Sequence, residues 1–395
     1  MLRNKVRQLA EEIYSGVVEN RRHLHANPEL SFHEFQTSAF IAGKLDELGI
    51  PYTRMADTGI VALLRGGIPS DKVVALRADM DALPIEEAND VSYRSKNPGV
   101  MHACGHDGHT SSLLGTATIL SRMKDEFAGT VKLIFQPAEE KLPGGASLMI
   151  REGVLENPKP EGVIGQHVMP LIDAGKVGFR SGKYMASSDE IYVRVIGKGG
   201  HGAQPHQNID PVVISAHIII ALQQVVSRMT DPKLPCVLSF GKVTASGATN
   251  VIPDEVLLEG TFRTFDEAWR TEAHGKMKRM AEGIAESMGG SCEFNIMRGY
   301  PFLVNEEKLT GEVRGFAEDY LGRENVEDLD LWMAAEDFAY YSQVSDACFY
   351  RLGIRNESRG ITSSVHTPTF DVDEDALKVG TGLMAYIALR RLGNQ

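Results

Sequence analysis

The chain has 395 residues, of which 43% are hydrophobic and 24% are charged, and its formal net charge is −12. This composition is that of an ordinary globular protein with room for two domains. The negative charge argues against binding to nucleic acid or to an anionic membrane, because both partners require a basic face.

Two features of the chain predict a cytoplasmic location. Residues 1–20 mix charges with apolar residues at helical spacing and lack the apolar core of a signal peptide. The four cysteines are widely spaced, with no Cys-x-x-Cys pair, which indicates free thiols in a reducing compartment. The most apolar run, residues 212–226, is interrupted by a histidine and two glutamines, so we expect it to be too short and too polar to span a bilayer.

The first part of the chain alternates between helix and strand patterns. Apolar residues recur at helical spacing over residues 34–48, and a second helix is expected over residues 110–123. Short apolar runs predict strands at residues 73–78, 131–135, 162–166 and 348–354. This alternation predicts an α/β domain with a largely parallel sheet.

The middle of the chain follows a different pattern. Strands are expected at residues 191–196, 236–243, 255–264 and 292–297, and helices at 210–229 and 265–288. The order βαββαβ is that of a ferredoxin-like α+β module. We therefore predict a main domain formed by residues 1–184 and 298–395, interrupted by a satellite domain of residues 185–297.

A segment before the second helix concentrates potential metal ligands. Residues 102–109 read HACGHDGH, with three imidazoles, one thiol and one carboxylate. Its two glycines, each about 1 kcal/mol less favourable than alanine in a helix, predict a bent loop. Thiolate together with imidazole suits zinc or a neighbouring first-row metal. The segment alone leaves open the alternative of a polar loop with one buried cysteine.

Further acidic and histidine side chains follow the ends of the predicted strands. They are Asp79, Asp81, Glu139, Glu140, His167 and His366. Because ligands bind beyond the carboxyl ends of the strands in open α/β sheets, we expect these side chains to meet at one edge of the sheet. An isolated Glu-Glu pair is usually a solvated loop, but this pair directly follows a strand and Pro137.

Several motifs in a fixed order carry a resemblance to a known family. They are RADMDALP (77–84), HACGHDGH (102–109), QPAEE (136–140), GQHV (165–168), GKGGHGAQPH (197–206), NVIPD (250–254), EDF (336–338) and HTP (366–368). From about residue 21 to its end, the chain resembles the co-catalytic metallopeptidases and amidohydrolases. That family includes aminoacylases, hippurate hydrolases and plant auxin-conjugate hydrolases.

The resemblance implies a dinuclear metal centre in the main domain. The implied ligands of two divalent metals are Cys104, His106, Glu140, His167 and His366. The expected metals are zinc or manganese, with cobalt or nickel as alternatives. Glu139 is implied to be the general base, and Asp81 to be the acidic residue that orients a ligand and sets the charge of the metals.

Two metals about 3.5–4 Å apart can share a water molecule and lower its pKa toward about 7. Glu139 would take the proton of this water as it attacks an amide carbonyl, and would then pass the proton to the leaving amine. Among the other histidines, we interpret His25 as structural, and His102 and His109 as residues that support the ligands.

Three residues of the satellite domain are implied to contact the substrate. In the family, the histidine equivalent to His201 reaches the partner subunit's active site, where it would stabilise an oxyanion. Asn250 and Arg263 would face a substrate carboxylate, for which Arg263 offers a bidentate fork. Without the resemblance, a salt bridge on the face of a strand explains Arg263 equally well. We expect a homodimer or a higher homo-oligomer that assembles through the satellite domain.

The expected reaction is the metal-dependent hydrolysis of the amide bond of an N-acyl amino acid, which releases a carboxylic acid and a free amino acid. A dipeptidase or carboxypeptidase of the same family is the alternative, because the sequence does not place the loops that form the acyl pocket. A non-catalytic metal-binding protein is a further alternative, although no ligand or base is missing. A zinc-dependent nucleobase deaminase requires His-x-Glu followed by Pro-Cys-x-x-Cys, and neither occurs.

Overall fold

The computed structural model describes residues 1–394, which form two compact units. The first unit comprises Met1–Tyr184, Val304–Asp330 and the chain from Tyr340 onward; the second comprises Met185–Leu303 and Leu331–Ala339.

The second unit therefore extends past residue 297 and includes a segment that no sequence pattern assigned to it. The backbone N–H of Ala186 lies 3.1 Å from the carbonyl oxygens of both Trp332 and Ala334, which attaches this segment to the start of the unit.

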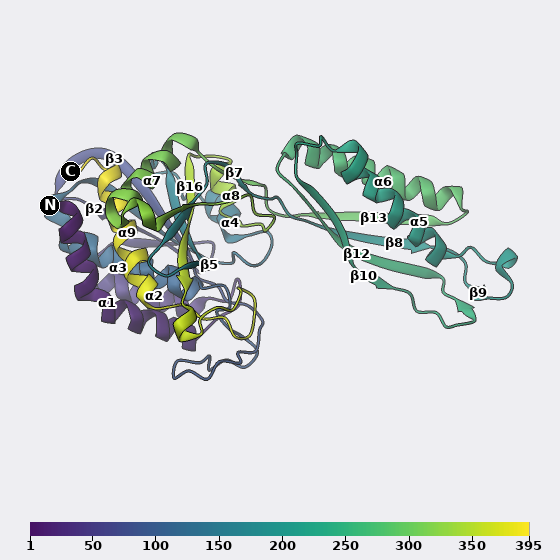
Figure 1. Cartoon of the computed structure of the whole chain (residues 1–395), viewed down its shortest axis with the longest axis horizontal. Helices are drawn as coiled ribbons and strands as arrows, with labels where there is room; N and C mark the ends of the chain where they lie inside the picture. The colour runs from purple at the N-terminus through teal and green to yellow at the C-terminus, as the bar shows by residue number, and fades with distance from the viewer. Residues whose placement is uncertain (395) are drawn as a thin grey trace. The chain divides into compact units, whose positions relative to one another are not determined.

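An eight-stranded sheet forms the centre of the first unit, in the order β1-β2-β4-β3-β5-β16-β6-β15. Figure 1 labels β2, β3, β5 and β16 of this sheet. The strands are β1 (Tyr52–Met55), β2 (Gly59–Arg65), β3 (Ile68–Asp79), β4 (Ala128–Gln136), β5 (Val163–Asp173), β6 (Val177–Phe179), β15 (Val326–Asp328) and β16 (Ala347–Arg355). The neighbours β4, β3, β5 and β16 run parallel, whereas β1–β2, β2–β4 and β16–β6 are antiparallel pairs. Both β4 and β16 are almost entirely buried, as expected for strands covered on both faces.

The helices of this unit are arranged in layers on the sheet. Helices α3 and α9 contact the strands, and α1 packs across both helices. Their bounds are α1 (Leu2–Ala26), α2 (Phe35–Glu47), α3 (His106–Arg122), α4 (Gly145–Arg151), α7 (Glu307–Leu321) and α9 (Asp375–Arg391). The buried face of α1 carries Val6, Ala10, Ile13, Val17 and Leu24. Successive members lie three or four residues apart, except between Val17 and Leu24. Arg21 lies between these two and is also buried.

Two sequence predictions near the site are wrong in detail. The helix α3 begins at His106 rather than after His109, because Gly105 adopts a left-handed φ of 82° and makes the turn just before the helix. The strand β5 continues to Asp173, so His167 lies within the strand and not beyond its end. The pairing with β16 continues at this position, where His167 is the register partner of Arg351.

The second unit is a four-stranded antiparallel sheet with two helices packed against it. Its chain order is β8 (Asp189–Ile196), α5 (Pro211–Gln224), β10 (Cys236–Thr244), β12 (Glu255–Thr264), α6 (Glu267–Ser287) and β13 (Ser291–Arg298), and the sheet order is β10-β12-β8-β13. Burial alternates along β8, as it does in a sheet with one face on a core. This βαββαβ unit, together with the sheet of the first unit, confirms the predicted fold class.

The remaining elements are short. They are β7 (Gly182–Met185), β9 (Gly200–His201), β11 (Val251–Ile252), β14 (Leu303–Asn305), α8 (Ala339–Ser342), the 3-10 turns Lys124–Glu126, Pro205–Gln207, Arg323–Asn325 and Glu357–Arg359, and the π-helical turns Val225–Met229 that continue α5.

With these π-helical turns, α5 reaches Met229, in agreement with the helix predicted over residues 210–229. In the described part of the chain, the stretch Pro211–Met229 is the one helix that is long and apolar enough to cross a membrane, with a mean hydropathy of 1.5. Ile214, Ile218 and Leu222 belong to the core of the second unit. Only 28% of the most apolar window is buried, so this helix also presents apolar residues on its surface.

Candidate metal centre

The five predicted ligands come from segments that meet at one edge of the main sheet. Cys104 precedes α3, and His106 is the first residue of that helix; Glu140 follows β4, His167 lies on β5, and His366 lies in the loop after β16. Because β4, β3, β5 and β16 are parallel neighbours, their carboxyl ends share one edge. The His366 N–H donates to the Ala103 carbonyl at 2.7 Å, which attaches its loop to the segment that carries Cys104.

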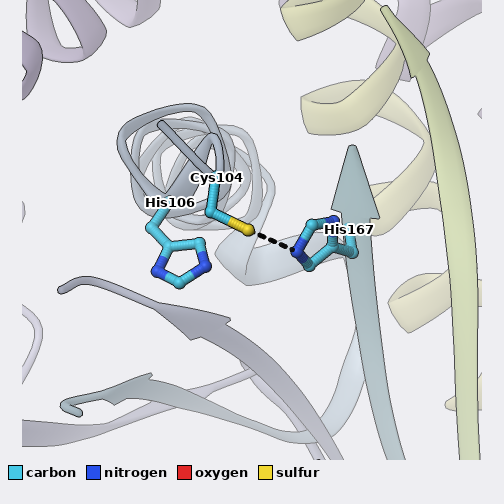
Figure 2. A group of neighbouring side chains, drawn as sticks. All are labelled: Cys104, His106 and His167. Atoms are coloured by element: carbon cyan, nitrogen blue, oxygen red, sulfur yellow. Dashed lines mark hydrogen bonds between the residues drawn. The ribbon is translucent and has the colours of Figure 1, made fainter. Parts of the chain in front are cut away.

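The donor atoms form two groups that share Cys104. One group is Cys104, His106 and His167, and the other is Cys104, Glu140 and His366; within each group, all donor atoms lie within 4.8 Å of one another. Figure 2 shows Cys104 and His106 at the start of α3, with the thiol directed at His167. Cys104 Sγ lies 3.4 Å from His167 Nε2. Two such ligands on one tetrahedral zinc ion would be about 3.6 Å apart, so the spacing fits a shared metal.

Hydrogen bonds orient two of the imidazoles for metal binding. His106 Nδ1 lies 2.9 Å from the Asp81 carbonyl oxygen, and His167 Nδ1 lies 2.8 Å from the Val168 carbonyl oxygen. Each Nδ1–H donates to its carbonyl, which leaves Nε2 for a metal. Among the described residues, His106 Nε2 is buried without a hydrogen-bond partner. Glu140 Oε1 lies 3.9 Å from this nitrogen and 3.1 Å from His366 Nε2. Buried polar atoms are rarely left unpaired, so this grouping of donor atoms fits a cation.

The electrostatics of the site favour a cation. Burial alone would lower the pKa of His106, but the carboxylates of Asp79, Asp81 and Glu140 raise it to about 10. Burial raises the pKa of the Cys104 thiol well above its usual value, and Glu140 adds to this effect. Both groups thus hold a proton strongly beside several carboxylates. A divalent metal would replace these protons and neutralise the negative charge.

Asp81 connects two segments that carry predicted ligands. Its Oδ1 lies 3.1 Å from His106 Nδ1, and its Oδ2 accepts hydrogen bonds from the Glu140 N–H at 3.0 Å and the Ser31 hydroxyl at 2.6 Å. This geometry suits a residue that orients ligands. A catalytic role for Asp81 stays a prediction.

His109 is held in a way that prevents metal binding. Its Nε2 accepts a hydrogen bond from the Val168 N–H at 2.9 Å, so the ring proton lies on Nδ1, which donates to Asp79 Oδ1 at 2.6 Å. Asp79 is held in turn by the Arg77 guanidinium at 2.7 Å. Both nitrogens of His109 are therefore in use, and His109 supports the backbone beside His167.

A buried ionic network, which the sequence did not predict, lies behind the predicted ligands. Asp107 Oδ2 lies 2.8 Å from both Arg21 Nε and His25 Nδ1, and His25 Nε2 lies 3.1 Å from Glu87 Oε1. The network connects the first turn of α3 to α1. One signal was available: Arg21 continues the apolar stripe of α1 between Val17 and Leu24, and a charged residue on such a stripe has to be paired.

The satellite residues fall into two places within the second unit. His201 on β9 pairs with Val251 of β11, and the Asn250 carbonyl accepts a hydrogen bond from the Gly202 N–H at 2.8 Å. His201 and Asn250 are therefore neighbours, and both are exposed. Arg263 lies at the other end of β12, where it donates to the Met333 carbonyl at 3.3 Å and forms no ion pair with any described residue.

The strand β12 separates Arg263 from the other two residues. At a rise of about 3.4 Å per residue, the eight steps from Glu255 to Arg263 span about 27 Å. Within one chain, the structure therefore does not bring Asn250 and Arg263 together, although both were predicted to face one carboxylate.

Comparison with known proteins assigns the family. The sequence profile of peptidase family M20/M25/M40 matches residues 75–390. This chain belongs to that family. The resemblance noted from the motifs is thereby confirmed.

Two relatives and one solved structure represent the proteins to which this chain is similar. The N-acyl-L-amino acid amidohydrolase of Geobacillus stearothermophilus is 46% identical over 309 residues, which cover 78% of this chain and 83% of that protein. Thermostable carboxypeptidase 2 of Saccharolobus solfataricus is 40% identical over 390 residues, 98% of each chain. The crystal structure of the YxeP protein of Bacillus subtilis, described as a dinuclear metal-binding peptidase of the M20 family, has a TM-score of 0.81 and 34% identity and covers 98% of this chain and 100% of that one. The enzyme is a metal-dependent hydrolase that acts on amide bonds, which confirms the predicted class of reaction.

Proposed function

We propose that this enzyme hydrolyses N-acyl amino acids at the amide bond and releases a carboxylic acid and a free amino acid. The observation that carries the proposal is the pair of donor groups that share Cys104, with the Glu139 carboxylate beside them. The similarity to an N-acyl-L-amino acid amidohydrolase supports this choice of substrate. The proposed ligands are Cys104, His106, Glu140, His167 and His366.

Glu139 and Glu140, which are adjacent in one loop, take different roles in this proposal. When bound, two divalent cations would lower the pKa of a water molecule toward about 7 and polarise the amide carbonyl. The donor atoms of Glu139 and Glu140 lie within 4.8 Å of each other and of His106. We assign Glu140 to the metal and Glu139 to the proton, which Glu139 takes from the attacking water and delivers to the nitrogen of the leaving amine.

Zinc or manganese is the metal that we propose. A thiolate with three imidazoles and one carboxylate leans toward zinc, while carboxylate ligands also suit manganese. Reconstitution of the enzyme with each ion decides between them. The measurements are the bound metal content and the rate of hydrolysis that each ion supports.

Recognition of the substrate carboxylate is assigned to Arg263. This side chain is half-buried, and its Nε and Nη1 donate to the Thr261 hydroxyl and the Met333 carbonyl, each at 3.3 Å. It forms no ion pair with any described residue, so its positive charge is left for an anion. A C-terminal peptide residue carries the same carboxylate, so a carboxypeptidase is the second candidate, supported by the 40% identity to a carboxypeptidase.

One panel of substrates tests both candidates. The metal-loaded enzyme is assayed with N-acetyl and N-benzoyl amino acids, with dipeptides, and with N-acyl amino acid amides that lack the carboxylate. We expect hydrolysis of the acylated amino acids, and little hydrolysis of the amides. Faster turnover of the dipeptides would favour the peptidase, and equal turnover of acids and amides would remove the role of Arg263.

We also propose a homodimer that assembles through the second unit. The exposed surface of α5 carries Val212, Val213 and Ile220, the last with 71% of its surface exposed, and a second copy of this helix would cover them. The separation of His201 from Arg263 supports the same arrangement, because His201 could then act on a substrate held by the other chain.

Mixing two inactive variants tests this arrangement. In a dimer of a His201→Ala chain with a Glu139→Gln chain, one of the two sites has both residues intact. Random reassociation should therefore restore about a quarter of the wild-type activity. No recovery in mixtures that form heterodimers, or an active monomer in gel filtration, would contradict the proposal.

We further propose a cytoplasmic location, which the free state of all four cysteines supports and which cell fractionation tests.

A further inference from the structure

Glu34 is a buried carboxylate that stands at the start of α2 but does not cap this helix. It occupies the N-cap position of α2, where an acidic side chain normally accepts hydrogen bonds from the first turn of the helix. Its side chain makes no such bond. Glu29 accepts instead from the N–H groups of Gln36 at 3.2 Å and Thr37 at 2.8 Å. Capping of α2 therefore does not explain Glu34.

The two oxygens of Glu34 bind elsewhere. Oε1 accepts from the backbone N–H of Ala138 at 2.8 Å, and Oε2 accepts from the Thr58 hydroxyl at 2.8 Å. Glu34 has no exposed surface. The carboxylate thus connects the start of α2 to the residue that immediately precedes Glu139.

Ala138 needs such a partner because its backbone is strained. Its φ is 50°, in the left-handed region that a residue other than glycine rarely adopts. Its carbonyl also accepts from the Gly145 N–H at 3.0 Å. A side chain at Gly145 would place a Cβ only 1.8 Å from the Pro137 carbonyl oxygen, so the loop is closely packed from this side. Fixing Ala138 fixes the direction in which the chain enters Glu139.

The residue after Glu139 is held in the same way. The Glu140 N–H donates to Asp81 Oδ2 at 3.0 Å. Glu139 therefore lies between two backbone N–H groups, each held by a buried carboxylate. Asp81 also contacts His106, whereas Glu34 is hydrogen-bonded to no predicted ligand.

We propose that Glu34 is a positioning residue that sets the geometry of Glu139 through the Ala138 N–H. This inference rests on the proposed role of Glu139 as the general base. What Glu34 contributes is its two hydrogen bonds and not its negative charge. Burial, and the nearby Asp81 carboxylate, raise the pKa of Glu34 to about 7, so the neutral acid is accessible at this site.

The geometry predicts an unusual order of variants. Glu34→Gln has the same length, its amide oxygen can accept from Ala138, and its NH₂ group can donate to Thr58, so kcat should stay within about threefold of wild type. Glu34→Asp keeps the charge but is one methylene too short for both bonds. Glu34→Ala loses both bonds. For the aspartate and alanine variants we expect kcat to fall by about 10- to 100-fold, as for a displaced catalytic group, with little change in KM or in metal content.

Two further variants separate positioning from general stability. Glu29→Ala is the matched control, since it also removes an acceptor of backbone N–H groups beside α2 but does not touch the loop of Glu139. It should lower the melting temperature and leave kcat unchanged. Ala138→Gly in the Glu34→Ala background should restore part of kcat, because glycine adopts a positive φ without an external partner.

Three results would overturn the inference. They are a kcat of Glu34→Ala equal to that of Glu29→Ala, a Glu34→Asp variant more active than Glu34→Gln, and a loss of activity that follows loss of metal. The order of Glu34→Gln and Glu34→Asp decides the matter even if Glu34→Ala does not fold. Glu139→Gln is assayed in parallel. If that variant is active, the proposed base is wrong, whereas an inactive Glu139→Gln with fully active Glu34 variants refutes the positioning role alone.

Discussion

Replacing Glu139 by glutamine removes the proposed general base. The side chain is 6% exposed, and the two backbone N–H groups beside it are bonded to Glu34 and Asp81, so the loop is held independently of the Glu139 carboxylate. The amide has the same shape but cannot take a proton from water. General-base catalysis contributes about 10²–10⁴-fold, so kcat should fall by that factor, which is a rise of about 3–5 kcal/mol in the activation barrier.

The assay combines steady-state hydrolysis of an N-acyl amino acid with measurement of bound metal. We expect Glu139→Gln to retain the metal content of the wild type. Glu140→Gln is the matched control, since it changes the neighbouring carboxylate in the same way but should lose metal. Wild-type kcat in a Glu139→Gln enzyme that carries its full complement of metal would refute the assignment. Loss of metal in both variants would show that the two carboxylates do not have separate roles.

Three further predictions concern residues that support the centre. His109→Phe leaves the Val168 N–H without its acceptor, so we expect metal affinity to fall by about 10- to 100-fold. Competition with a chelator measures this affinity, and an unchanged value would show that His109 has no part in the site. Arg21→Met leaves the Asp107 carboxylate buried beside His25 alone, and urea unfolding should show a loss of about 3–5 kcal/mol, with Asp107→Asn in the same chain recovering part of it. Burial alone would raise the pKa of Asp107, but Arg21 and His25 hold it well below its usual range. The unfolded chain therefore binds this proton more tightly, stability falls as pH drops below about 4, and Asp107→Asn should flatten that dependence in acid-unfolding experiments.

The sequence was sufficient to predict that these donor side chains lie close together, because several of them follow the ends of predicted strands, while the set of ligands was implied by the family resemblance and stays a prediction. Parallel strands place their carboxyl ends together, and this brought residues as distant as Asp81 and Glu140 to one site. The start of α3 was misplaced because two glycines were taken as evidence against a helix. Gly105 lies just before the helix, so of these two glycines only Gly108 carries the cost of about 1 kcal/mol, and the buried ion pairs of Asp107 hold the first turn in place.

The supporting residues could not be found in this way. Glu34 has the sequence environment of a helix cap, and only the structure shows that Glu29 caps the helix and that Glu34 reaches Ala138. Likewise, His109 stands in the same segment as Cys104 and His106, and only the hydrogen bond from the Val168 N–H separates it from the predicted ligands. Tertiary hydrogen bonds of this kind have no periodicity along the chain that a sequence pattern would reveal.

The charges around the centre make metal binding depend on pH. Without metal, the pKa of His106 is raised to about 10 by Asp79, Asp81 and Glu140 against the effect of burial, and burial holds the pKa of the Cys104 thiol above its usual value. Both groups are protonated at neutral pH, and a metal can bind them only after both protons leave. For each proton released, affinity should rise by about tenfold per pH unit. Chelator competition at several pH values measures this slope, and Cys104→Ser should reduce it by the one proton that the thiol contributes. A slope of zero in the wild-type enzyme would mean that His106 and Cys104 do not bind the metal.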